Sequence, residues 1–477
     1  MKNEFSAIVR REQTKQQLEL VSETIIKELD ALVASDEFGL HKTQFESIKT
    51  ILEIAIGELK THVDEIKVAE LDLEDVYDAC RDFDEAIIWL QRLWGYLNEK
   101  FGQRQGTSEV SRLLKAADEV VWSCFHSVLS RSIGQHGPAP LTYIEPEYSP
   151  ATIQTDMPLP PSLRLEADLE FLDQCLETLP VPVLRLPPTC VSSPWWLVLI
   201  GHEVGHHVQY ALDLIGHFRK GLTAAARAKK FSEDEAASTW GNWGEEIFSD
   251  VFAIMIMGES ALRAIVELET GPAEKMVRRK PNYPAPAIRL ALMKELADRL
   301  ELESEKALLG LDLDAIANTD PLSAMDYAVV PAAIDFVLEP FPDGSSLTEL
   351  CGFRKSVFNE GNRVSGWSVL LKSENNLVVD KKQMLELNTA RDVICGSLKA
   401  WAQHAKGTTA SDSQDAYSER NKIRDRIGNN TIDVLLLSGP RETRKAVQTP
   451  LRQGQGKALA DLLRNRSTRK GGAQGAV

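Results

Sequence analysis

The sequence predicts an α+β fold that is predominantly α-helical, with a small sheet in its core and helical domains on either side. Three observations lead to this prediction. Apolar residues recur at helical spacing over most of the chain. One stretch near the middle holds twelve of the 22 prolines and cannot be a regular helical bundle. With 477 residues, 43% hydrophobic and 26% charged, the chain is long enough for two to four globular domains.

Residues 1–135 are predicted to form a helical bundle. Apolar side chains return every three or four residues in three successive segments, as at Leu18, Ile25 and Leu29 in the first of them. The other two segments show the same spacing over residues 48–59 and 87–97. This region holds no combination of residues that suggests catalysis.

Residues 136–193 form the proline-rich segment. Its best strand candidates are Leu141–Ile144 and residues 181–186, and one short helix is expected over residues 163–179. Because proline lacks the N–H that a sheet ladder needs, we expect these strands at sheet edges.

Residues 194–300 contain the most informative motif of the chain. His202 and His206 are four residues apart, so in a helix they project from one face, close enough to share a tetrahedral zinc ion. Glu203 lies about 100° round the helix from His202, so it need not bind the metal and can act as general base toward a zinc-activated water. This is the HExxH arrangement of zinc hydrolases. Two hydrogen-bonded core histidines are the alternative interpretation of the motif alone.

The residues around the motif predict a buried helix. Ser193 and Pro194 are typical of a helix start, and the helix is expected to continue to about Ile215, which places the histidines mid-helix. Gly205 weakens a helix, so its presence suggests that another element packs closely there. His207 points to a different face and is interpreted as a supporting or surface residue.

A second segment offers a third ligand. Glu246 and Asp250 are four residues apart on one helical face, and the apolar run that follows predicts a buried helix. A buried carboxylate needs a partner such as a metal ion. An exposed acidic pair at a helix start is the alternative. Glu245 is the competing ligand, which helix geometry disfavours because Asp250 would then lie off its face.

This combination resembles the gluzincin metallopeptidases, in which HExxH is followed by a helix bearing ExxxD. The resemblance implies a zincin-like metallopeptidase core over residues 194–300. It also implies that Glu246 is the third zinc ligand and that Asp250 accepts a hydrogen bond from the ring N–H of His202. Peptidases of this class commonly bind an extended substrate against an edge strand, so the proline-rich segment is expected to line the cleft.

The resemblance extends loosely to Tyr283 and Arg289. They follow the second metal helix, where the gluzincin group of prenyl-protein and heat-shock membrane proteases has a His-Pro segment and a later arginine. This chain departs from that pattern, with Tyr283 in place of the histidine and without membrane spans. Tyr283 is a candidate donor to a developing oxyanion, and Arg289 a candidate to hold a substrate carbonyl or carboxylate. A packed tyrosine and a surface arginine are the alternative.

The remaining chain is divided into two parts. Residues 301–405 are predicted to be a C-terminal helical region with a break near residues 340–344. Residues 406–477 are predicted to be a polar, basic and partly disordered tail, since residues 441–477 contain nine Lys or Arg and two acidic residues.

Charge and composition limit the partners and the compartment. The formal net charge of −16 argues against nucleic-acid binding, except through the basic tail. No segment approaches 18 uninterrupted apolar residues, and the N-terminus lacks a secretory signal, so no membrane span is expected. The six cysteines form no CxxC pair and are expected to be buried thiols. We therefore expect a cytoplasmic protein.

The expected function is a soluble zinc metallopeptidase that hydrolyses peptide bonds of an intracellular protein. One Zn²⁺ per chain would be held by His202, His206 and Glu246, with Glu203 as general base and the fourth position open. A zinc-stabilised scaffold that binds partners is one alternative, and a zinc amidohydrolase acting on a non-peptide substrate is another. The sequence gives no oligomeric state.

Overall fold

The computed structural model of the chain describes residues 2–35, 41–129, 139–145, 151–153, 171, 174–175, 178–179, 182–229, 234–341, 343–358, 363–374, 379, 384, 389–407, 414–438 and 454–473. The chain divides into two compact units. The first unit comprises residues 1–106, 153–183 and 440–477, and the second comprises residues 107–152 and 184–439.

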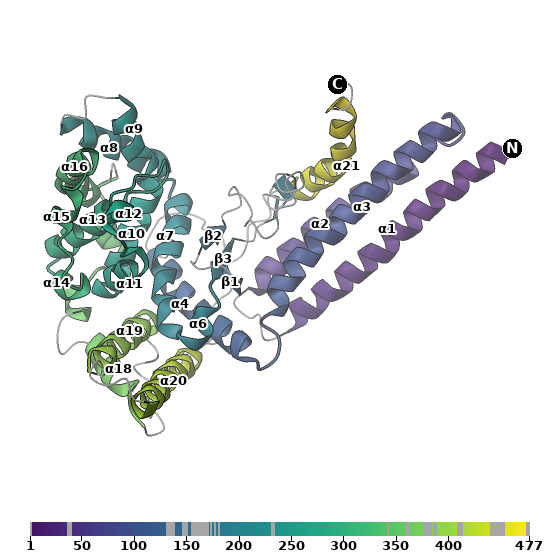
Figure 1. Ribbon diagram of the computed structural model, residues 1–477. Helices are drawn as coiled ribbons and strands as arrows, with labels where there is room; N and C mark the ends of the chain where they lie inside the picture. Colours follow the sequence, from purple (N-terminus) through teal and green to yellow (C-terminus); the bar gives the residue numbers. More distant parts are fainter. Residues whose placement is uncertain are drawn as a thin grey trace. The chain divides into compact units, whose positions relative to one another are not determined.

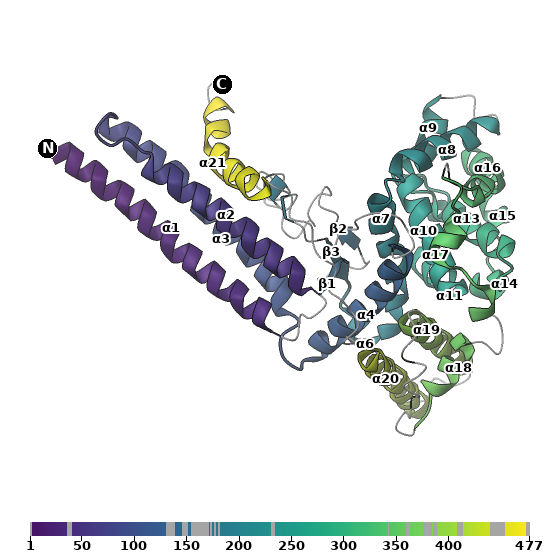
Figure 2. The same ribbon diagram turned by 180° about the vertical axis from the view of Figure 1, so that it is seen from behind.

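The first unit is built from long helices: α1 (Lys2–Ala34), α2 (Lys42–Asp64), α3 (Leu73–Gly102) and α21 (Gln455–Ala473). Helix α1 packs along α2 and α3, and α21 packs against both α2 and α3 (Figure 1, Figure 2). Most side chains at helical spacing are buried as the sequence predicted, Leu18, Ile25 and Leu29 among them, but Leu20, Ile54 and Ile88 are exposed. Full burial of each such side chain contributes about 1.5–3 kcal/mol.

The second unit is a larger assembly of mostly shorter helices. In chain order these are α4 (Glu109–Leu129), α6 (Thr189–Ser192), η3 (Pro194–Leu199), α7 (Ile200–Ala211), α8 (Ile215–Ala228), α9 (Asp234–Asn242), α10 (Gly244–Met257), α11 (Glu259–Glu269), α12 (Ala273–Met276), α13 (Pro286–Arg299), α14 (Ser304–Ala307), α15 (Leu313–Ala317), α16 (Pro321–Leu338), α17 (Leu347–Cys351), η4 (Lys355–Val357), α18 (Arg363–Leu370), α19 (Thr389–Gly407) and α20 (Gln414–Leu437). Helix α10 lies at the centre of this unit, packed against α7, α8, α11 and α13. The expected break near residues 340–344 is confirmed, because it separates α16 from α17.

Three short strands form one sheet in the order β1-β3-β2: β1 (Leu141–Ile144), β2 (Ala151–Ile153) and β3 (Val183–Leu186). The fold is thus mostly helical with a small sheet, as expected. The expectation that both proline-flanked strands are edges was wrong for β3, which is the central strand. Pro182 precedes β3 and Pro187 follows it, so neither proline interrupts the ladder. The helix expected over residues 163–179 lies mostly outside the described residues.

The units do not coincide with the expected domain ranges. Helix α4 was expected in the N-terminal bundle, but it packs against α7, α19 and α20 of the second unit. The expected tail contains two packed helices, α20 in the second unit and α21 in the first. The buried side chains of Ile427, Val434 and Leu435 explain why α20 is ordered despite its polar composition.

Within the described residues, one helix is long and apolar enough to cross a membrane by length and composition. This is α16, whose 18-residue window has a mean hydropathy of 1.4 and is 39% buried. A core helix of a soluble protein passes the same test, so α16 is weak evidence for a membrane span. It packs against α13 and α8, and its buried Asp326 pairs with Arg279. All six cysteines are free and buried, as expected.

Candidate metal centre

The motif helix begins differently from the prediction. Pro194–Leu199 form the 3-10 helix η3, and the α-helix α7 runs from Ile200 to Ala211. Ser193 makes no capping hydrogen bond through its side chain. The helix stops before the expected Ile215 because the chain turns at Asp213, which has a left-handed φ of 54°. His202 and His206 remain one turn apart on α7.

Helix α7 packs very closely against α10 at Gly205. A Cβ atom at this position would lie 2.7 Å from the Cα of Ser249 in α10, which is too short for any side chain. One turn earlier, a Cβ at Gly201 would lie 3.0 Å from Cγ of Met257. The prediction that another element packs closely at Gly205 is confirmed, and this approach brings the α10 carboxylates to the histidines of α7.

Three side chains from these two helices converge. His202 Nε2 lies 3.3 Å from Glu246 Oε2, and His206 Nε2 lies 3.7 Å from Glu246 Oε1. The imidazole rings are nearly perpendicular, at 89°. One donor atom from each of the three residues lies within 4.8 Å of the others.

This arrangement fits a metal ion better than it fits a hydrogen-bonded cluster. Donor atoms about 2.1 Å from a tetrahedral ion lie about 3.4 Å apart, close to the separations from Glu246 to the two Nε2 atoms. Glu246 Oε2 is buried, and its contact with His202 Nε2 lacks the geometry of a hydrogen bond. The buried group of His202, His206 and Glu246 can therefore hold a metal ion.

Asp250 orients the first histidine. Its Oδ1 lies 2.8 Å from His202 Nδ1, the contact that the resemblance implied, so Nε2 is left to face Glu246. Burial lowers the pKa of His202, but the charge and the hydrogen bond of Asp250, together with the contact to Glu246, outweigh it and raise this pKa to about 10. Burial raises the pKa of Asp250, but Arg289 and His202 together hold it well below its usual range.

Arg289 has a different contact set from the one expected. Its side chain is buried, with Nε 2.7 Å from Asp250 Oδ2, Nη2 2.8 Å from Asp250 Oδ1 and Nη1 2.7 Å from Glu269 Oε1. A guanidinium engaged with two carboxylates is not available to hold a substrate carboxylate, and it is not a surface arginine either. It supports Asp250, which in turn aims His202.

Tyr283 lies at the rim of the group. The residue is 39% exposed, and its hydroxyl lies close enough to Glu246 and Glu203 for their charges to act on it. Burial of the phenol, together with the negative charges of Glu246 and Glu203, raises the pKa of Tyr283 well above 10, so the hydroxyl keeps its proton. The guanidinium carbon of Arg289 lies 5.9 Å from the ring centroid.

Three other residues that the sequence suggested for this site, Glu203, His207 and Glu245, do not belong to the three-residue group. Glu203 is buried on α7 and is not part of the three-residue group. His207 is buried, which excludes the surface interpretation, and burial lowers its pKa to about 3, so its ring is neutral. Glu245, the competing ligand, is only partly buried and lies outside the group.

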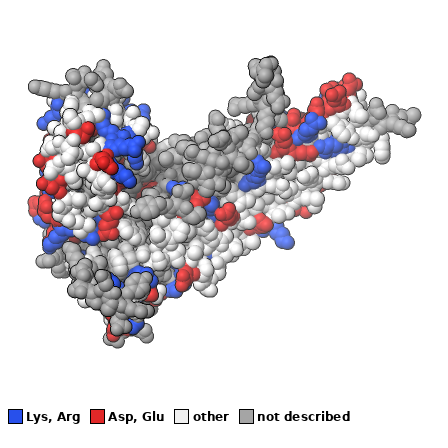
Figure 3. All heavy atoms as spheres, in the orientation of Figure 1, with Lys and Arg blue, Asp and Glu red and all other residues white. Residues whose placement is uncertain are grey.

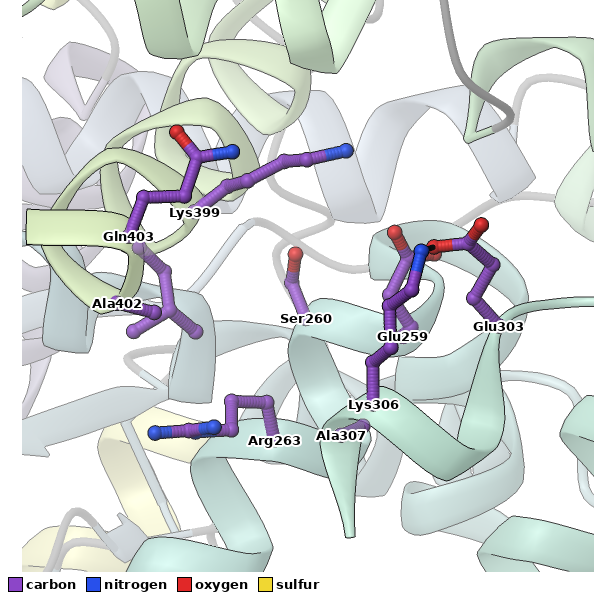
Figure 4. Close-up of a pocket in the computed structure, with 10 residues that line it drawn as sticks. Glu259, Ser260, Arg263, Glu303, Lys306, Ala307, Lys399, Ala402 and Gln403 are labelled. Carbon is purple, nitrogen blue, oxygen red and sulfur yellow. Dashed lines mark hydrogen bonds and ion pairs between the residues drawn. The ribbon is translucent and has the colours of Figure 1, made fainter. Parts of the chain in front are cut away.

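A separate cavity of about 190 Å³ lies elsewhere in the second unit, between α11, α14 and α19 (Figure 4). Charged side chains on its wall include Glu259, Arg263, Lys306 and Lys399, with Lys306 paired to Glu303 at 2.9 Å. None of the residues of the metal-ligand group lines it.

Comparison with known proteins gave no match: no protein-family model, no curated protein and no solved structure matches this chain.

Proposed function

We propose that this chain is a soluble, cytoplasmic zinc metallopeptidase of the gluzincin type. The observation that carries the proposal is the convergence of His202, His206 and Glu246, with Glu203 beside the first histidine but outside the ligand group. Three protein ligands with the fourth position open are typical of catalytic zinc, whereas structural sites use four. One Zn²⁺ per chain is proposed.

Each residue has a distinct task in this proposal. Zinc, when bound, supplies Lewis-acid polarisation of the scissile carbonyl and lowers the pKa of water. Glu203 accepts the proton of the attacking water and then delivers it to the leaving amide nitrogen. Tyr283 keeps its proton and can donate it in a hydrogen bond to the developing oxyanion. Asp250 and Arg289 keep the imidazole of His202 aimed at the metal position.

The imidazole and carboxylate donors favour zinc over a hard cation. Magnesium and calcium take oxygen ligands, whereas two imidazoles and one carboxylate are a common catalytic set for zinc. The carboxylate of Glu203 beside the ligand group favours the peptidase over a zinc-stabilised scaffold, because a structural site needs no general base. An amidohydrolase acting on a non-peptide substrate uses the same ligands, so the substrate test below must include peptides.

The experiment compares two adjacent glutamates. Zinc content is measured in wild type, Glu246→Ala and the matched control Glu245→Ala, and cleavage of a peptide library is measured before and after chelation and zinc restoration. We expect about one zinc per chain in wild type and Glu245→Ala, depleted zinc in Glu246→Ala, and cleavage that is lost and restored with zinc. Full zinc in Glu246→Ala would refute the ligand assignment. Full zinc in wild type with no peptide cleavage would favour the scaffold or the amidohydrolase.

A further inference from the structure

A short basic segment borders the candidate centre. It follows α12 and reads Arg278, Arg279, Lys280 before Pro281. Arg279 is partly buried, with Nε 2.8 Å from Asp326 Oδ2 and its guanidinium carbon 4.9 Å from the Trp243 ring centroid. Arg279 is therefore committed to the fold.

Lys280 and Arg278 differ from Arg279. Both are exposed, and neither forms an ion pair with an acidic side chain in the part of the chain that the structure describes. Some lysines and arginines of the second unit form ion pairs, for example Lys355 with Glu301 and Arg299 with Asp335, whereas others, such as Lys220 and Lys275, are exposed and form no ion pair among the described residues. Figure 3 shows Lys and Arg side chains gathered on the second unit where the labels α8, α9 and α12 stand in Figure 1.

The backbone of Lys280 is anchored next to the metal ligands. Its carbonyl accepts a hydrogen bond of 2.9 Å from Trp243 Nε1, immediately before α10, and its N–H donates to Tyr283 O at 3.3 Å. Its Nζ lies 5.6 Å from the centroid of the Tyr283 ring, and the hydroxyl of that ring lies near the carboxylate of Glu246. The Lys280 ammonium is thus on the order of 10 Å from the ligand group, about three residues of extended chain.

We propose that Lys280 selects peptide substrates that carry an acidic side chain about three residues from the scissile bond. This inference rests on the proposed peptidase function. A chain of net charge −16 repels acidic peptides over most of its surface. An exposed lysine at the rim of the site, with no carboxylate paired to it, therefore gives a local preference for acidic segments. The complementary substrate is an acidic peptide segment.

The test uses zinc-loaded full-length protein and a random peptide library, with the residues around each cleaved bond read by mass spectrometry. The variants are Lys280→Glu and the matched charge reversal Lys422→Glu, whose side chain is 67% exposed on α20. We expect wild type and Lys422→Glu to cleave peptides with Asp or Glu near the bond about 3- to 10-fold better than those with Lys or Arg. Lys280→Glu is expected to reverse this preference, and 0.5 M salt to weaken it.

The outcomes separate the two claims. An acidic preference that is unchanged in Lys280→Glu overturns the assignment of Lys280. Cleavage by wild type without any acidic preference overturns the inference and leaves the peptidase intact. No cleavage by zinc-loaded wild type overturns the peptidase and the substrate inference together. Binding of fluorescent acidic peptides to Glu203→Gln, lost in the double variant with Lys280→Glu, would support recognition of acidic segments independently of cleavage.

Discussion

Arg289 donates a hydrogen bond to each carboxylate oxygen of Asp250, with Nε 2.7 Å from Oδ2 and Nη2 2.8 Å from Oδ1. The same carboxylate contacts His202 Nδ1 at 2.8 Å. Arg289 on α13 therefore orients the imidazole of His202 on α7 through the carboxylate of Asp250 on α10. This chain of contacts is buried throughout, so each member depends on the next.

Replacing Arg289 tests this dependence. A lysine at position 289 lacks the two-pronged guanidinium that bonds both oxygens of Asp250, so we expect the zinc affinity of Arg289→Lys to fall about 10- to 100-fold. Arg289→Ala leaves Asp250 buried without its cation and is expected to cost about 3–5 kcal/mol of stability. Competition with a zinc chelator and urea unfolding measure the two effects. Arg299→Ala, on the same helix but exposed, is the control and is expected to change neither by more than about 1 kcal/mol. Unaltered zinc affinity in Arg289→Lys would show that the orientation of His202 does not depend on the paired hydrogen bonds between Arg289 and Asp250.

Metal binding is expected to release a proton from His202. Burial lowers its pKa, but Asp250 and Glu246 raise it to about 10, so the metal-free ring carries both protons at pH 7. A metal must displace the proton on Nε2, so zinc affinity should rise about tenfold per pH unit between pH 6 and pH 8. Titration calorimetry in two buffers of different ionisation enthalpy counts the protons released. Asp250→Asn removes the strongest influence that raises the pKa and should reduce this count. Affinity that is independent of pH in wild type would contradict the expectation.

Gly205→Ala tests the close approach of α7 and α10. The added Cβ would meet the Cα of Ser249 at 2.7 Å, so the helices must separate, at a cost of about 1–3 kcal/mol. Separation of the helices also moves Glu246 away from the two histidines, so Gly205→Ala should lower zinc affinity as well as the free energy of unfolding. The control is Gly216→Ala in α8, whose Cβ meets no atom within 4 Å and which should be neutral or slightly stabilising. Equal stability of the two variants, measured by urea unfolding, would argue against the tight contact.

Because of Asp326, the free energy of unfolding is expected to decrease as the pH rises through the acid range. Burial raises its pKa to about 6, against the opposing effects of Arg279 and Trp240. Because the folded pKa exceeds the unfolded value of about 3.9, the folded state holds the proton more tightly, and this contribution is lost as pH rises from about 4 to 6. Wild type should lose about 1–3 kcal/mol more than Asp326→Asn over this window, by urea unfolding. Asp335→Asn, exposed on the same helix, should retain the wild-type slope.

The helices and the ligand group were predictable because local spacing determines them. His202 and His206 had to share a face of any helix, and Glu246 and Asp250 likewise. Gly205 signalled a close neighbour, and Ser249 is that neighbour. Apolar periodicity in residues 18–97 likewise predicted buried helix faces.

The remaining features depend on contacts between distant segments. A proline count could not reveal that β3 is central, because the prolines fall just outside the strand. Arg289 follows Asp250 by 39 residues, and no spacing rule links them across two helices. The packing of α20 could not be predicted from its polar composition, since it depends on Ile427, Ile432, Val434 and Leu435, which are buried in a helix that packs against α4 and α19.

The most direct test of the central claim compares zinc-loaded wild type with zinc-loaded Glu203→Gln on one peptide library. Glutamine keeps the size of the side chain but cannot accept the proton of the attacking water. The proposed mechanism predicts equal zinc content in the two proteins and a cleavage rate at least about 100-fold lower in Glu203→Gln. Cleavage at an undiminished rate by Glu203→Gln would contradict the assignment of Glu203 as general base and with it the proposed chemistry.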